Sequence, residues 1–146
     1  MKQFAVAVVV AVGLVLIGCG SSNNSSSNTI NGNWNANLMS GGNTPVFAFG
    51  TSMTENSDGT VTITNFSFTT SSPCFDSETE SGSFTLGGNF NGSVGGKFGM
   101  TVQSSTPIGN TLTLTGAVSG NTITGTWTLT GSSGCTGSGS FTMTKM

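Results

Sequence analysis

Apolar and polar residues alternate with a period of two through most of the chain from Ile30 onwards. Between Ile30 and Leu38, residues of one parity include Trp34 and Ala36, while asparagines occupy the other parity. Such alternation is typical of a β-strand with one buried and one solvated face. No segment after Ile30 repeats its apolar residues with the 3.6-residue period of a helix. The sequence therefore predicts an all-β fold.

The same alternation returns in about eight short segments. Asp58-Gly59 separates the second segment from the third and favours a hairpin turn. Within the third segment the apolar parity changes after Ile63, which predicts a β-bulge near Asn65. The apolar faces are formed, in chain order, by Ile30, Trp34, Ala36 and Leu38; Phe47, Phe49 and Met53; Val61, Ile63, Phe66 and Phe68; Phe84, Leu86 and Phe90; Phe98, Met100 and Val102; Leu112, Leu114 and Val118; Ile123, Trp127 and Leu129; and Phe141 and Met143.

Short turns between consecutive segments predict an antiparallel up-and-down arrangement, which can close into a barrel or divide into a β-sandwich. Gly32, Gly116 and Gly125 stand at positions of inward parity. Glycines there suit strands that bend sharply around a small barrel. We therefore expect an up-and-down barrel of about eight strands, with a sandwich as the alternative.

The N-terminus carries Lys2 followed by an apolar run too short to span a bilayer, a pattern typical of an export signal. The run ends in Leu16-Ile17-Gly18-Cys19, which resembles the lipobox of bacterial lipoproteins. This resemblance implies that residues 1–18 are removed and that the Cys19 thiol carries a diacylglyceryl group. It also implies a further acyl chain, such as palmitate, on the new amino group, and several chains make a stable anchor. The alternatives are an ordinary secretory signal with a coincidental cysteine and an uncleaved helix.

Residues 19–28 continue the chain as a Ser/Asn-rich tether without apolar side chains to bury. Gly20 follows the cysteine, where an aspartate would resemble an inner-membrane retention signal. In a cell with two membranes we therefore expect the outer membrane, and residues 29–146 are left to form a single β domain.

Charge is nearly absent: the chain has three Lys and Arg residues, five Asp and Glu residues, and no histidine. Nucleic-acid binding needs clustered basic residues, so that partner class is not expected. Because imidazole is absent and thiols are few, a zinc or iron centre is not expected, and a Ser-His nucleophile cannot be assembled without histidine. We expect no enzyme activity and no cofactor.

Gly32-Asn33-Trp34 resembles the Gly-x-Trp opening of the calycins, the group that contains lipocalins and avidins. In lipocalins this tryptophan closes one barrel end beneath a basic residue from a late strand, so the resemblance implies that Trp34 and Lys145 close one end here. The chain departs from the family in having no arginine and no C-terminal helix pattern. The alternative is that Trp34, like Trp127 in a second Gly-x-Trp, simply fills the core.

Cys74 and Cys135 remain once Cys19 is assigned to lipid. In an exported protein two remaining thiols predict a disulfide, and an up-and-down meander places both connections at the same barrel end. Near Cys74, Asp76, Glu78 and Glu80 alternate along the chain, where they form either a calcium site or a solvated acidic rim.

These observations predict a lipid-anchored, non-enzymatic β-barrel of the cell envelope, with a small apolar ligand in its mouth or interior. The alternative is a structural or protein-interaction module of the envelope with a solid core and no ligand.

Overall fold

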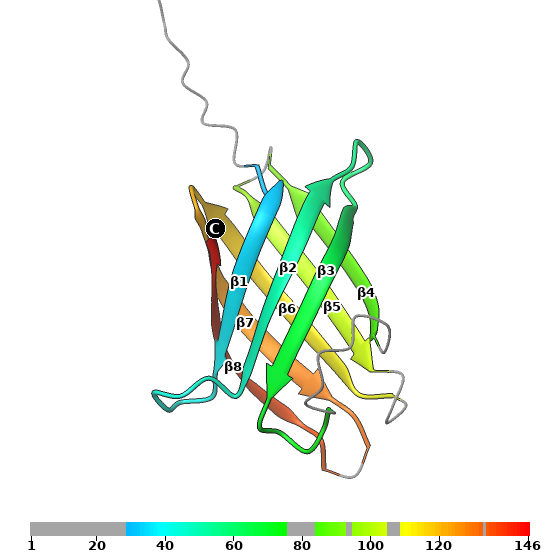
Figure 1. Ribbon diagram of the computed structural model, residues 1–146, viewed down its shortest axis with the longest axis vertical. Coiled ribbons are helices and arrows are strands. Elements are labelled where there is room, and N and C mark those ends of the chain that lie inside the picture. Colours follow the sequence, from blue (N-terminus) through cyan, green and yellow to red (C-terminus); the bar gives the residue numbers. More distant parts are fainter. Residues whose placement is uncertain (1–28, 76–83, 93–94, 105–108, 133) are drawn as a thin grey trace, which may run out of the picture.

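The computed structural model describes residues 29–75, 84–92, 95–104, 109–132 and 134–146, and its regular elements are all β-strands (Figure 1). None of these residues belongs to a helix that is long and apolar enough to cross a membrane. The strands are β1 (Gly32–Met39), β2 (Phe47–Glu55), β3 (Val61–Thr70), β4 (Phe84–Asn91), β5 (Lys97–Ser104), β6 (Thr111–Ser119), β7 (Thr122–Thr130) and β8 (Gly137–Lys145).

The eight strands form one antiparallel sheet in the order β3-β2-β1-β8-β7-β6-β5-β4. Each strand pairs with its sequence neighbour except at one junction, and β1 also pairs with β8, from Trp34 opposite Lys145 to Met39 opposite Ser140. The sheet thereby curls into a nearly closed barrel (Figure 1). The predicted up-and-down barrel is confirmed, and the sandwich alternative is wrong.

The remaining junction, between β3 and β4, is a seam rather than a paired ladder. Among the described residues, one bridge joins Thr60 to Asn89, and the Phe90 N–H donates to the Gly59 carbonyl oxygen at 2.9 Å. From that bridge the two strands diverge towards the opposite end of the barrel (Figure 1). Within the described part of the chain, hydrogen bonding therefore closes the barrel at only one end of this seam.

Side chains close the rest of the seam. A Cβ atom built on Gly88 would lie 3.1 Å from the Val61 Cβ and 3.2 Å from the Ile63 Cδ1, so β4 already lies against these side chains. Farther along, the Phe66 and Phe84 rings meet edge to face with centroids 5.3 Å apart. Apolar contact replaces main-chain hydrogen bonds here.

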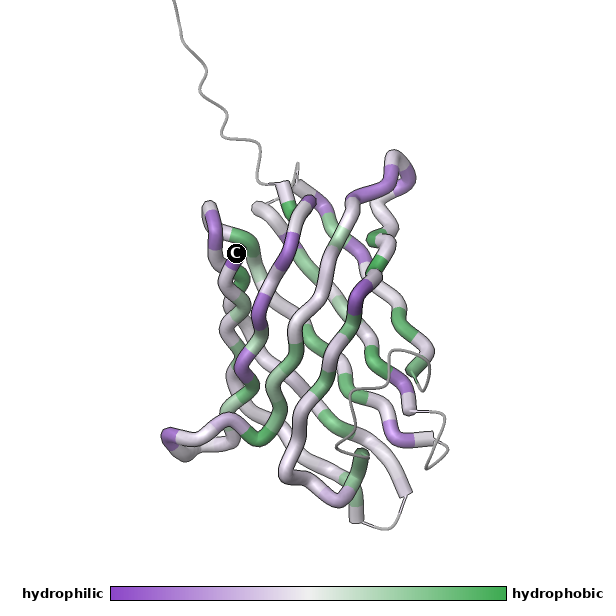
Figure 2. The backbone as a smooth tube through the Cα atoms, in the orientation of Figure 1, coloured by the Kyte–Doolittle hydropathy of each residue, from purple (hydrophilic) through white to green (hydrophobic). Residues whose placement is uncertain are grey.

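The barrel interior is formed by the apolar parity of the strands. Hydrophilic and less polar residues alternate along the tube of β1 in Figure 2, as the sequence predicts. On β7, for example, Ile123, Trp127 and Leu129 are buried while Thr124, Thr126 and Thr128 are exposed. Burying one face of every strand is the main source of stability in such a fold.

The predicted bulge lies at Asn65. Gly50 pairs with Ser67 but Ser52 pairs with Thr64, so β3 contains one extra residue relative to β2. Asn65 has φ of 50°, a left-handed conformation that asparagine tolerates better than most residues. The bulge moves the following phenylalanines onto the inward face.

Two of the predicted inward glycines allow a close approach of strands. Phe98, Gly116, Gly125 and Phe141 are successive cross-strand partners from β5 to β8, and the two rings meet above the glycines with centroids 6.5 Å apart. A Cβ on Gly116 would lie 2.9 Å from the Phe141 Cζ, so a larger residue could not share this level of the barrel.

Candidate functional sites at the barrel ends

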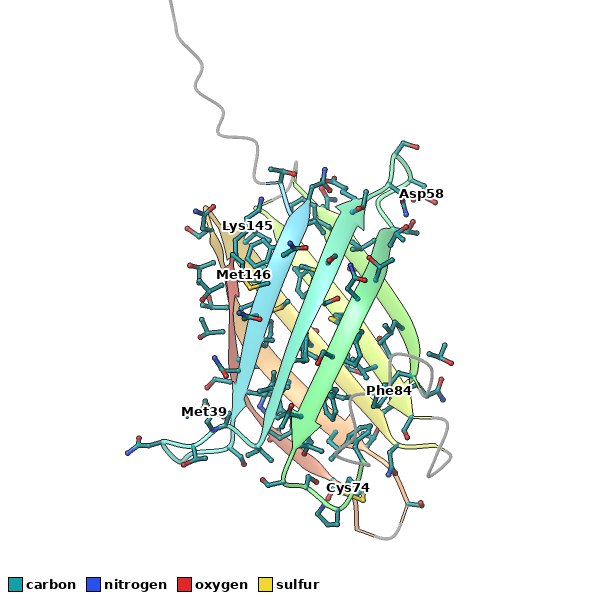
Figure 3. All side chains as sticks on the ribbon, in the orientation of Figure 1. Met39, Asp58, Cys74, Phe84, Lys145 and Met146 are labelled. Carbon is teal, nitrogen blue, oxygen red and sulfur yellow. A yellow bond between two sulfur atoms is a disulfide. The ribbon has the colours of Figure 1, made fainter. Side chains whose placement is uncertain are left out.

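Both ends of the described chain lie at the same end of the barrel (Figure 1). The Met146 N–H donates to the Asn33 carbonyl oxygen, and the Lys145 N–H donates to the carbonyl oxygen of Asn121 in the β6–β7 turn, each at 2.9 Å. Figure 3 shows Lys145 and Met146 at this end and Cys74 at the other. We call these the terminal end and the disulfide end.

Trp34 and Lys145 meet at the terminal end. Trp34 is fully buried, and its indole N–H donates to the Ile30 carbonyl oxygen at 2.7 Å. The Lys145 Nζ lies 5.7 Å from the centroid of the Trp34 ring, within the range of a cation–π contact. Gly32 is exposed, contrary to its expected inward position, and has φ of 129°; a Cβ there would lie 2.9 Å from the Lys145 Cε. The structure therefore brings the two residues together, and their role in closing the barrel remains a prediction.

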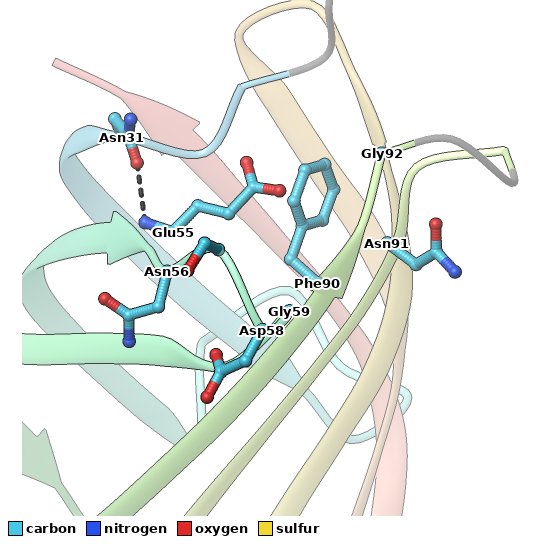
Figure 4. A pocket seen from close by; sticks show the side chains of 9 residues that line it. Asn31, Glu55, Asn56, Asp58, Gly59, Phe90, Asn91 and Gly92 are labelled. Atoms are coloured by element: carbon cyan, nitrogen blue, oxygen red, sulfur yellow. Dashed lines mark hydrogen bonds between the residues drawn. The ribbon is translucent and has the colours of Figure 1, made fainter.

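An open pocket of about 480 Å³ also lies at the terminal end, between the β2–β3 turn and β4 (Figure 4). The Glu55 side chain extends towards the Phe90 ring in Figure 4, and the Asn31 Oδ1 accepts a hydrogen bond from the Glu55 N–H at 2.6 Å. The lining consists of Asn31, Glu55, Asn56, Ser57, Asp58, Gly59, Phe90, Asn91 and Gly92.

The carboxylate of Asp58 holds the β2–β3 turn. Its Oδ1 accepts hydrogen bonds from the Thr60 hydroxyl at 2.6 Å and from the Thr60 N–H at 2.9 Å. These two bonds, the hydroxyl first, lower the pKa of Asp58 below its ordinary value. An acid catalyst needs a raised pKa, so Asp58 is suited to a structural role in the turn.

The disulfide end contains the predicted bridge between Cys74 and Cys135. Their Cα atoms are 5.5 Å apart, and the bond joins the β3–β4 connection to the β7–β8 connection. The prediction from cysteine count and topology is confirmed.

Asn110 lies beside this bridge and was not predicted from the sequence. It is 1% exposed, and its Nδ2 donates to the Cys74 carbonyl oxygen at 2.6 Å. Its Oδ1 is buried without a hydrogen-bond partner among the described residues, and a Cβ on Gly131 would collide with that oxygen. The amide thus ties the segment around Cys74 to the base of β6.

Phe75 forms part of an aromatic cluster at the same end and was also missed. It is 3% exposed although it belongs to a connection rather than a strand. Its ring centroid lies 5.7 Å from that of Phe47, 5.3 Å from that of Phe68 and 6.2 Å from that of Phe84. Its position beside Cys74 was the only signal for it in the sequence.

The outer face of the barrel is rich in hydroxyl groups. Charged side chains among the described residues are Glu55, Asp58, Lys97 and Lys145, so most of this face is uncharged. Within β6, β7 and β8, threonines pair across strands as Thr111–Thr130, Thr113–Thr128, Thr115–Thr126, Thr122–Thr144 and Thr124–Thr142. Threonine suits a solvated strand face because it is both β-branched and polar.

Several predicted residues lie outside the described residues, and their roles remain predictions. These are Cys19 with its signal peptide and tether, and the carboxylates Asp76, Glu78 and Glu80. Within the described ranges, no three His, Cys, Asp or Glu side chains are grouped closely enough to hold a metal ion.

No family model, no curated protein and no solved structure matches this chain.

Proposed function

We propose that the protein is a lipid-anchored, non-enzymatic β-barrel of the cell envelope that acts through its outer surface. The observation that supports this most directly is the occupation of the barrel interior by the chain's own aromatic rings. The other parts of the proposal are the anchor at Cys19, the orientation that it implies and the mostly uncharged outer face.

Two ring contacts cross the barrel. Phe47 of β2 meets Trp127 of β7 edge to face at 5.3 Å, and Phe98 of β5 meets Phe141 of β8 at 6.5 Å. In each case the two strands are separated by two others in the sheet, so the contact spans the interior. Aromatic centroids 4.5–7 Å apart are in direct contact, which leaves no ligand-sized space between them. Small eight-stranded barrels are either filled in this way or hold one ligand.

The anchor determines which end of the barrel faces the membrane. The tether would join lipid on Cys19 to the fold at Thr29, which leads into β1 at the terminal end. A flexible segment of about ten residues has a root-mean-square length of about 17 Å. The terminal end would then stay near the membrane surface, with the disulfide end directed outwards.

A partner of this surface would meet hydroxyl and amide groups rather than charges. Asn35 and Asn37 of β1 and the threonine pairs of β6–β8 provide donors and acceptors for such a partner. We infer that the partner is another envelope protein or a surface polymer, bound through hydrogen bonds. The two described acids, Glu55 and Asp58, both line the open pocket at the terminal end, where the Asp58 carboxylate accepts hydrogen bonds from Thr60 within its own turn.

A ligand carrier is the second candidate, and the seam between β3 and β4 favours it. Ile63, Phe84 and Leu86 are only partly buried there, so the seam offers an apolar surface between strands that are not hydrogen-bonded along their length. The calycin-like pairing of Trp34 with Lys145 is compatible with either candidate, and we retain that relationship as a proposal.

The two candidate functions predict different results when a hydrophobic fluorophore is titrated into the oxidised protein: the carrier should bind it saturably, and a filled barrel should not. We expect no saturable binding by the wild type. Phe98→Ala is a positive control, because removal of a buried ring leaves an apolar cavity that can admit a ligand. Saturable binding by the wild type, displaced by lipids from the native envelope, would instead support the carrier.

The surface role can be tested with a photo-crosslinking residue at Thr128 on the outer face, compared with one at Gly42 in the β1–β2 connection. We expect a reproducible adduct in intact envelopes from the Thr128 position. No adduct from this or any other outer threonine position would argue against a surface partner.

The anchor can be tested by metabolic labelling with a fatty acid. The wild type and Cys135→Ala should both be labelled, whereas Cys19→Ala should not. Label that persists in Cys19→Ala would contradict the lipobox interpretation.

A further inference from the structure

The disulfide end of the barrel is filled by a side chain that no strand supplies. Phe75 inserts its ring among Phe47, Phe68 and Phe84, with centroid distances between 5.3 and 6.2 Å. It meets Phe47 at an interplanar angle of 88° and Phe68 at 67°, so both contacts are edge-to-face. The strands thus form an aromatic-lined recess, and the β3–β4 connection fills it.

The bonds that hold Phe75 in this recess are made by the preceding residue, Cys74. Cys74 is covalently joined to Cys135, its carbonyl oxygen accepts from the Asn110 Nδ2 at 2.6 Å, and its N–H donates to the Ser72 Oγ at 3.3 Å. Of these three bonds, the disulfide alone is covalent, and it alone can be broken by a reductant.

We propose that this recess is a binding site for a small apolar aromatic molecule, occupied by Phe75 in the oxidised protein and opened by reduction of Cys74–Cys135. The proposal goes beyond the surface role proposed above, which does not require it. The lining favours a flat ring of the size of a phenyl group, because that shape already satisfies the edge and face contacts of the surrounding phenylalanines.

The opening step needs an external dithiol. One thiolate of the dithiol attacks Sγ of Cys135, which is partly buried, whereas Cys74 is 8% exposed. A mixed disulfide forms on Cys135, and the Cys74 thiolate leaves and takes up a proton. The second thiol of the dithiol then attacks its own sulfur in the mixed disulfide and releases Cys135 as a thiol. The protein gains two electrons and two protons, and the dithiol becomes a cyclic disulfide.

The two tryptophans provide one reporter at each end. Trp127 contacts Phe47, which lines the recess, and its indole N–H donates to the Met39 carbonyl oxygen at 3.0 Å. Trp34 lies at the terminal end beneath Lys145. A ligand in the recess should therefore shift the NMR signal of the Trp127 indole N–H and leave that of Trp34 unchanged.

Toluene is the probe, added to four forms of the full chain. We expect no saturable shift for the oxidised wild type and a saturable shift of the Trp127 signal after reduction by a dithiol. The Cys74→Ser/Cys135→Ser double variant should give that shift with or without dithiol. Phe75→Ala should give it with the disulfide intact, because the ring that fills the recess has been removed.

Phe75→Ala keeps the proposal testable if reduction loosens the whole fold. Failure of oxidised Phe75→Ala to bind toluene would overturn the binding site. Equal binding by oxidised and reduced wild type would overturn the control by the disulfide, as would a reduced protein that keeps both indole signals dispersed but binds no toluene. None of these results bears on the anchor or on the surface partner, which are tested separately.

Discussion

Gly125→Ala tests whether the strands approach as closely as the barrel requires. A Cβ at Gly125 would collide with the Thr115 carbonyl oxygen and would lie 2.5 Å from the Gly116 Cα and 2.8 Å from the Thr115 carbonyl carbon. All three atoms belong to the backbone of β6, so no side chain can rotate away. The β6 and β7 backbones would have to separate by roughly 1 Å, because ordinary contact begins near 3.4 Å.

The expected cost follows from these contacts. Overpacking of a filled core costs typically about 1–3 kcal/mol, and distortion of the ladder at the Gly116–Gly125 pair places this site near the upper end. Replacing glycine by alanine also reduces the entropy of the unfolded chain, which offsets about 0.4–1 kcal/mol. We therefore expect a net loss of about 2 kcal/mol. For a domain of this size the melting temperature should fall by roughly 8 °C.

The matched control is Gly87→Ala in β4. No heavy atom lies within 4 Å of a Cβ at Gly87, and its φ is not in the left-handed region. The same substitution should therefore leave stability unchanged or raise it by up to about 1 kcal/mol. Both variants can be compared by urea denaturation and thermal melting. Equal stability of the two would refute the close approach of β6 and β7.

Three further predictions concern the turn, the bulge and the disulfide. Because hydrogen bonds from Thr60 lower the pKa of Asp58 in the folded protein, the stability that Asp58 contributes is complete above its unfolded pKa and is lost as the pH falls through its folded pKa. Thr60→Val should raise the folded pKa of Asp58 and therefore reduce the loss of stability in acid. An NMR titration midpoint of Asp58 that does not change in Thr60→Val would contradict the assigned cause. Asn65→Val should cost about 1–2 kcal/mol in urea denaturation because of its left-handed φ of 50°, whereas Asn65→Gly should not; equal stability would argue against the bulge. Cys74→Ser or Cys135→Ser should lower stability by about 2–5 kcal/mol and leave the far-UV circular dichroism β-like, and free alkylation of both thiols in the native, unreduced protein would show that the bridge is absent.

The strands could be predicted because their pattern is local. Alternation assigns each residue to a face within its own segment, and the parity change beside Asn65 required an extra residue in that strand. The disulfide was predicted from the count of thiols and from topology, since consecutive hairpins place Cys74 and Cys135 at one end.

The seam could not be predicted because it depends on the circumference of the whole barrel. No single segment encodes whether β3 reaches β4, and the periodicity of Ile63 and Leu86 is the same as that of paired strands. Phe75 and Asn110 were missed for a different reason. Both lie in connections between strands, where no alternation of apolar and polar residues indicates which way a side chain points. Their burial is seen only in the folded disulfide end of the barrel.

Gly32 was assigned to the wrong face because it begins β1. Its parity matches that of Trp34, but its φ of 129° departs from an extended strand, and the buried positions of β1 begin at Trp34. The contact with Lys145 replaces the inward role that we expected for this glycine.

The most direct test of a filled barrel is the mass of the protein extracted from its envelope without reductant, measured first under native and then under denaturing conditions. Lipid on Cys19 is covalent and contributes equally to both masses. If the interior rings occupy the barrel and the protein acts through its surface, the two masses should be equal. A native mass larger by one small molecule at fixed stoichiometry, lost on denaturation, would contradict the account.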